Sequence, residues 1–227
     1  MVLFAFGFPA LTAPSYSKRR AAMLGGDREL KKREYRETIA WLTAMGVASL
    51  AFFVLTGLDL ALLGAAWPSS LRGGASVALA ASGSAILLLQ VRAVRVDPAT
   101  RAAAREALMP VREYFPSSVD EKRLFRGVSI AAGIGEELFY RGFLLWYLGQ
   151  WLPLWAAVVV SSLLFGLAHV MHGAQATARS TLMGVVLAGL YLLGGSLVAP
   201  MILHTAVDLT SGESGASAFA DESTVAI

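Results

Sequence analysis

The chain has 227 residues, of which 56% are hydrophobic and 15% charged, and its formal net charge is +3. Soluble domains carry roughly 25% charged residues, so the deficit indicates a membrane protein. Cysteine is absent, which excludes disulfides, a cysteine nucleophile and cysteine-held zinc. Most lysines and arginines fall in two blocks, 18–36 and 92–126. Cationic loops beside anionic lipid explain this distribution, and no nucleic-acid partner is expected.

A helix needs about 20 mostly apolar residues to cross a bilayer. The hydropathy pattern predicts an all-α, polytopic membrane helix bundle with about six transmembrane helices. One Lys/Arg-rich block precedes the first predicted span and the other follows the second, so both lie on the same side of the membrane. The positive-inside rule places that side in the cytoplasm and predicts an N-in/C-in topology. The predicted spans are 38–58, 75–94, 124–148, 154–172, 181–193 and 197–210.

The chain divides into five parts. Residues 1–37 are predicted to be a cytoplasmic or interfacial segment, and 38–96 to hold the two N-terminal transmembrane helices. Residues 97–119 form a predicted cytoplasmic amphipathic connector, in which Asp97 is a good N-cap. Residues 120–210 form a transmembrane core that carries the candidate site. The Ser/Gly/Ala-rich residues 211–227 are predicted to be a flexible cytoplasmic tail.

Two adjacent carboxylates, Glu136 and Glu137, interrupt the third predicted span. A charge at bilayer depth costs at least ~2.5–3.5 kcal/mol, so such residues usually face a polar cavity or a partner and mark function. Glu137 precedes Arg141 by four residues, so the two are predicted to pair on one helix face. Glu136 is rotated by about 100° and should point elsewhere. The alternative is that both carboxylates pair with bases and only hold helices together, which would leave one of them poorly compensated.

Two later spans each carry a histidine. Phe165 and His169 are four residues apart on the fourth span, and His204 and Asp208 are four apart on the sixth. Asp208 could hold His204 in one tautomer, or both could bind a common ligand. Each histidine taken alone could equally be a hydrogen-bonded structural residue. The three segments taken together predict a site inside the membrane.

The motifs read EELFYR at 136–141, FGLAH at 165–169 and HTAVD at 204–208. Residues 120–210 thereby resemble the CPBP intramembrane endopeptidases, the CAAX-protease and bacteriocin-processing (Abi) family, which includes the type II prenyl-protein proteases. That family's pattern is Glu-Glu-x3-Arg, then Phe-x3-His, then His-x3-Asn or Asp. The resemblance implies an intramembrane endopeptidase that hydrolyses a peptide bond in a membrane-anchored or hydrophobic peptide or protein. We expect an integral, multi-pass protein of a bacterial plasma membrane.

The resemblance also implies roles for single residues. Glu136 would be the catalytic carboxylate, and His169 would help it to activate water. His204 and Asp208 would polarise the carbonyl or stabilise the oxyanion. An ionised Asp cannot donate a hydrogen bond, so Asp208 must be protonated, orient His204 or ligate a metal. Glu137, Arg141 and Phe165 would support the site.

The resemblance favours a glutamate-dependent enzyme without a cofactor, and the zincin motif His-Glu-x-x-His is absent. A Zn²⁺ site is the alternative, because two histidines and a carboxylate can hold zinc with a position left open for water. Its ligands would come from Glu136, His169, His204 and Asp208. Another alternative is a non-enzymatic, proton-coupled transporter that uses these residues as a relay, although no internal repeat is visible.

Overall fold

The structure is a computed structural model that describes residues 15–220, and all regular structure within this range is helical. Residues 15–24 form an N-terminal helix that precedes α2. The prediction for residues 1–14 lies outside the described residues. The long helices are α2 (Arg28–Thr56), α3 (Leu71–Val96), α8 (Ala174–Gly194) and α9 (Val198–Ala218). The shorter helices are α4 (Pro98–Leu108), α5 (Val119–Glu137), α6 (Leu145–Gly149) and α7 (Leu154–Leu167), with η1 (Leu60–Leu63), η2 (Met109–Tyr114), η3 (Leu138–Leu144) and η4 (Val170–His172) between them.

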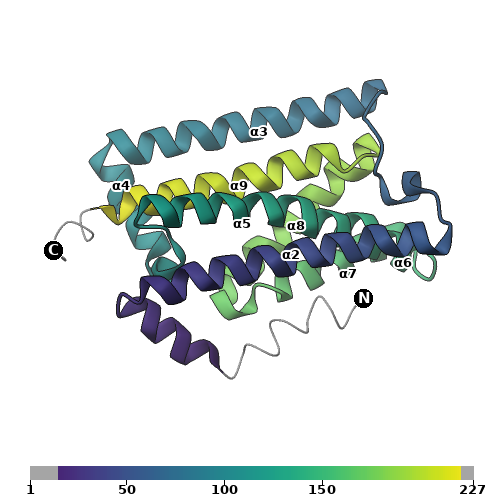
Figure 1. The fold of residues 1–227 in the computed structure, drawn as a ribbon. Helices are drawn as coiled ribbons and strands as arrows, with labels where there is room; N and C mark the ends of the chain where they lie inside the picture. The colour runs from purple at the N-terminus through teal and green to yellow at the C-terminus, as the bar shows by residue number, and fades with distance from the viewer. Residues whose placement is uncertain (1–14, 221–227) are drawn as a thin grey trace.

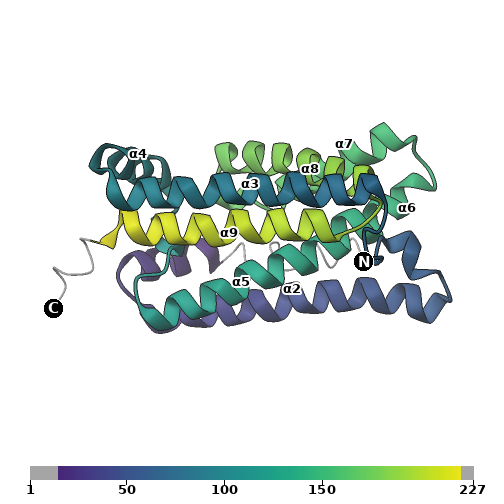
Figure 2. The same cartoon turned by 90° about the horizontal axis from the view of Figure 1, so that it is seen from above.

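The long helices run roughly parallel to one another, and α9 lies between α3 and α5 (Figures 1 and 2). Helix α2 packs along α5, and α7 packs along α8. One end of the bundle carries the connector α4 and the start of α2, and the other carries the η1 turn and α6 (Figure 1). The two Lys/Arg-rich blocks therefore meet at the end that holds α4, which we call the cationic end.

The all-helical class is confirmed for residues 15–220, and three helices are long and apolar enough to cross a membrane. These three are α2, α3 and α8. The prediction of about six spans in an N-in/C-in arrangement is not settled by this finding. Helix α7 has 14 residues and is about 21 Å long at 1.5 Å per residue, shorter than a bilayer core of about 30 Å.

The connector begins as the sequence predicted. The Asp97 carboxylate accepts a hydrogen bond from the backbone N–H of Thr100 at 2.8 Å, and Pro98 occupies the first turn of α4. Ser118 caps α5 by accepting from the N–H of Glu121 at 3.3 Å. These caps satisfy N–H groups that a helix start leaves unpaired.

The predicted start of the flexible tail is wrong, because α9 continues beyond residue 210 to Ala218. Its glycines allow close packing: a Cβ on Gly212 would lie 2.3 Å from the Phe125 ring, and one on Gly215 would lie 2.2 Å from the Phe115 ring. Glu213 bonds two arginines at the cationic end. The Ser/Gly composition therefore reflects tight packing here. Residues 221–227 lie outside the described part of the chain.

Candidate active site

Glu136 and Glu137 lie where the third predicted span changes from an α-helix to a π-helix. Helix α5 ends at Glu137, and residues 138–144 form a π-helix, η3, before α6 begins. All seven residues of η3 are buried. A π-turn changes the direction in which the following side chains point and is frequent at functional sites. Spacing alone gave no signal for this change.

The predicted pair of Glu137 and Arg141 is present. Arg141 Nη1 donates to Glu137 Oε1 at 2.8 Å, and both side chains are almost fully buried. Arg141 Nη2 also donates to the carbonyl of Gly184 on α8 at 3.1 Å. The guanidinium lies 4.4 Å from the centre of the Phe165 ring on α7. Arg141 thus joins the glutamate pair to two other helices, which explains why a full charge is tolerated at this depth.

Three carboxylates surround His204. Its Nδ1 is 2.7 Å from Glu137 Oε1. On the other side of the ring, Nε2 is 3.5 Å from Glu136 Oε2 and 3.8 Å from Asp208 Oδ2. The nearest partner of His204 is therefore Glu137, whereas the sequence suggested Asp208. Glu137 is 67 positions away along the chain, so no local spacing rule could have found this contact.

His169 approaches the same centre from the end of α7. The helix stops at Leu167, and His169 caps the short η4 that follows. Its Nδ1 lies 2.9 Å from the carbonyl oxygen of Phe165, which leaves Nε2 available for another partner. The Phe165 ring is 5.1 Å from the His169 ring and 5.6 Å from the His204 ring. Phe165 therefore packs against both histidines.

A cavity of about 310 Å³ connects these groups, and Glu136, His169 and Asp208 line it together. His204 is 4% exposed, and its Nε2 faces Glu136 and Asp208. The cavity wall thus presents Glu136, Asp208 and His169, and the His204 imidazole contacts both of these carboxylates. Glu34 and His172 also line the cavity. This arrangement can bind and deprotonate water beside a polar group that accepts developing charge.

Other parts of the lining come from segments that the motifs did not indicate. Tyr16 and Arg19 of the N-terminal helix, Trp41 of α2 and Tyr114 of η2 all line it. The Tyr16 hydroxyl donates to the carbonyl of Met171 at 2.6 Å, which ties the N-terminal helix to the loop after His169. The part of the chain outside the motifs therefore shapes the cavity.

The zinc alternative was tested on the arrangement of ligands. Among residues 15–220, no group of three or more His, Asp or Glu side chains is placed to hold a metal ion. His204 Nε2 lies 3.5 Å from Glu136 Oε2 and 3.8 Å from Asp208 Oδ2, separations that neighbouring ligands of one ion also have, and His204 Nδ1 is occupied by Glu137. Zinc dependence therefore stays an alternative to the glutamate mechanism.

Neither the curated proteins nor the solved structures contained a match to this chain. A family model described as type II CAAX prenyl endopeptidase Rce1-like matches residues 123–210. This segment includes all three motifs and the helices α7 and α8. The match confirms, for residues 123–210, the resemblance to the CAAX-protease family that the motifs indicated.

Proposed function

We propose that the protein is an intramembrane endopeptidase of the CAAX-protease type, which cleaves a peptide bond in a membrane-associated protein or peptide. The observation that carries the proposal is the single cavity lined by Glu136, His169 and Asp208, with His204 in contact with both carboxylates. The family match over residues 123–210 supports a protease of this class. The family description names a prenyl endopeptidase, which favours a prenylated or otherwise lipid-anchored substrate.

In the proposed reaction, Glu136 is the general base that takes a proton from water, and His169, which lines the same cavity, orients that water. The hydroxide attacks the carbonyl carbon, and the negative charge that develops on the carbonyl oxygen is stabilised by a proton held on His204 Nε2. The bond from carbon to nitrogen then breaks, and the proton taken by Glu136 passes to the leaving amine. General acid–base catalysis of this kind contributes typically 10²–10⁴-fold.

Glu137 gives His204 its orientation in this proposal. A proton on Nδ1 donates to Glu137 Oε1 over 2.7 Å, and Arg141 holds that carboxylate from the other side. A fixed imidazole needs no reorganisation when charge develops. Asp208, at 3.8 Å from Nε2, then helps to keep a proton on that nitrogen.

We also propose that the protein spans the membrane with about six helices in an N-in/C-in topology. The clustering of the Lys/Arg-rich blocks at one end of the bundle supports this proposal (Figure 1). The protein has no native cysteine, so single cysteines can be introduced at Ala65 and Ala103 and labelled with an impermeant maleimide. They should label from opposite sides of the membrane, and labelling from the same side would contradict the topology.

The function is tested by cleavage of a membrane-anchored reporter in reconstituted vesicles. Wild type should cleave it, Glu136→Ala should not, and Glu106→Ala should behave as wild type because Glu106 is an exposed residue of α4. Cleavage by Glu136→Ala at the wild-type rate would refute the proposal. A chelator arm with elemental analysis separates the two protease mechanisms. Full activity in chelator without stoichiometric metal supports the glutamate mechanism, and a requirement for bound zinc overturns it.

A further inference from the structure

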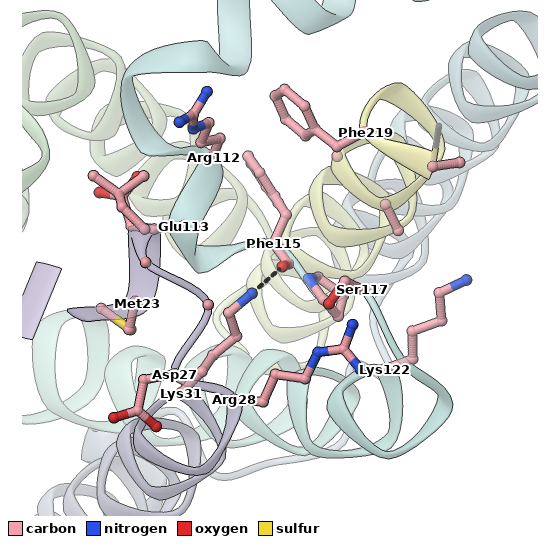
Figure 3. A pocket seen from close by; sticks show the side chains of 17 residues that line it. Met23, Asp27, Arg28, Lys31, Arg112, Glu113, Phe115, Ser117, Lys122 and Phe219 are labelled. Carbon is pink, nitrogen blue, oxygen red and sulfur yellow. Dashed lines mark hydrogen bonds between the residues drawn. The ribbon is translucent and has the colours of Figure 1, made fainter. Parts of the chain in front are cut away.

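A second cavity, of about 410 Å³, lies at the cationic end of the bundle. Figure 3 shows the side chains that line it. It opens where α2 and α5 begin and where α9 ends. Residues 23–31 form one wall, residues 112–117 another, and the end of α9 with Phe219 a third. None of the motif residues lines it, so the proposed protease reaction does not explain it.

Four cationic side chains line this cavity: Arg28, Lys31, Arg112 and Lys122. Lys31 already has partners, since its Nζ donates to the carbonyl of Phe115 at 2.9 Å and lies 3.5 Å from a Glu121 oxygen. The other three make no ion pair within 4.0 Å among the described residues.

The two carboxylates on the cavity wall do not neutralise these cations. Asp27 caps α2 and accepts from the backbone N–H of Leu30 at 2.9 Å. Glu113 Oε1 lies 2.5 Å from Arg20 Nε. The cavity therefore keeps an excess of positive charge, and the N-termini of α2 and α5 add their partial positive charge beside it.

One further feature narrows the chemistry of an occupant. The Phe115 and Phe219 rings stack at 6.2 Å and give the cavity an apolar side. An occupant should thus combine a negative charge with an apolar part.

We propose that this cavity binds the headgroup of an anionic phospholipid such as phosphatidylglycerol. Arg28, Arg112 and Lys122 attract its negative charge from different walls of the cavity (Figure 3). The glycerol backbone and the start of the acyl chains lie along Phe115 and Phe219. Basic pockets between membrane helices at the cytoplasmic side bind lipid headgroups by the same physics.

The test measures binding of fluorescent phosphatidylglycerol to the full-length protein in neutral detergent, with fluorescent phosphatidylcholine as the uncharged comparison. Wild type should prefer phosphatidylglycerol. Arg28→Gln combined with Lys122→Gln should weaken that binding roughly tenfold or more, since each cation near an anionic lipid contributes about 1 kcal/mol. The matched control is Arg36→Gln with Arg123→Gln, which removes the same charge from exposed positions outside the cavity and should bind as wild type.

The proposal is overturned if wild type shows no preference, or if the control pair loses as much affinity as the cavity pair. Competition by glycerol phosphate and by inorganic phosphate separates a lipid site from a site for a free anion. Weak competition supports the lipid, and competition as strong as that of unlabelled phosphatidylglycerol overturns it. Arg112→Gln gives a second readout: phosphatidylglycerol should raise the melting temperature of wild type by mass action and raise that of the variant less.

Discussion

The helices that carry the candidate site and the helices best suited to cross a membrane are different helices. Helices α2, α3 and α8 are long and apolar and expose large side chains such as Leu55 (85%) and Leu71 (92%). Helix α9 carries His204 and Asp208, and Ile202 is its one exposed large apolar side chain in the described structure. Since α9 packs against α3, α5 and α8, the His204 imidazole is surrounded by protein, and Asp208 faces the cavity. The apolar helices thus shield a site that could not face lipid.

The same comparison explains why hydropathy alone is a poor guide to the catalytic region. The helices long enough to cross a membrane provide much of the outer surface. The site groups lie on α5, on α9 and just beyond the end of the short apolar helix α7. The polar groups of the site are instead stabilised by one another, as in the chain of contacts from Arg141 through Glu137 to His204. The following substitutions test this division of roles.

Among these substitutions, the largest effect is expected at His204. His204→Ala should lower kcat by about 10²–10³-fold, the usual cost of removing one donor that stabilises an oxyanion. Asp208→Asn should keep most of the activity, because Glu137 is the nearer partner of the imidazole. Steady-state kinetics on the anchored reporter, with thermal melting as a check of folding, measures both variants. Equal losses would show that Asp208 must be a carboxylate and that Glu137 alone does not orient His204.

A second large effect is expected when the buried pair is broken. Glu137→Gln leaves the Arg141 charge unpaired inside the protein and should lower the free energy of unfolding by about 3–5 kcal/mol. The matched control is Glu37→Gln on α2, which breaks another i,i+4 pair with Arg33 whose side chains are 41% and 61% exposed. That change should cost no more than about 1 kcal/mol. Denaturation in mild detergent compares the two, and similar losses would contradict a structural role for the buried pair.

The part of the site that the sequence predicted correctly is the part that depends on local geometry. The pair of Glu137 and Arg141 follows from a four-residue spacing, and the cap at Asp97 follows from residue type. The contact of His204 with Glu137 joins residues from different helices, and only the packing of α5 against α9 brings them together. The cavity wall at Tyr16 was missed for the same reason. The extension of α9 was missed because glycine and serine favour disorder in isolation, whereas here they let Phe115 and Phe125 approach the helix.

A moderate effect is expected where α2, one of the long apolar helices, packs against α5, which carries Glu136. A Cβ on Gly135 of α5 would lie 2.2 Å from the backbone oxygen of Leu42 on α2. Gly135→Ala should therefore push the two helices apart and cost about 1–3 kcal/mol, and it should also lower activity because Glu136 is the next residue. Gly189→Ala on α8 has open space around the new Cβ and should be stabilising by roughly 0.5–1 kcal/mol. Melting temperatures of the two variants should move in opposite directions, and a stabilised Gly135→Ala would disprove the close contact.

The smallest effect is expected in the acid stability of the cationic end. Burial alone would raise the pKa of the Glu121 carboxyl. The carboxylate accepts hydrogen bonds from the Ser117 backbone N–H (2.7 Å) and hydroxyl (2.9 Å), and the Lys31 charge lies nearby. These interactions outweigh burial and hold the pKa below its usual 4.5. A carboxyl whose pKa is lower in the folded state stabilises the fold above its unfolded pKa, and this contribution is lost as the pH falls through the folded value. Glu121→Gln should thus lower stability at neutral pH and flatten the decline in melting temperature below about pH 4.5. The exposed Glu106→Gln should keep the wild-type profile. A Glu121→Gln profile that stays parallel to wild type down to low pH would show that this carboxylate contributes nothing to folding at the cationic end.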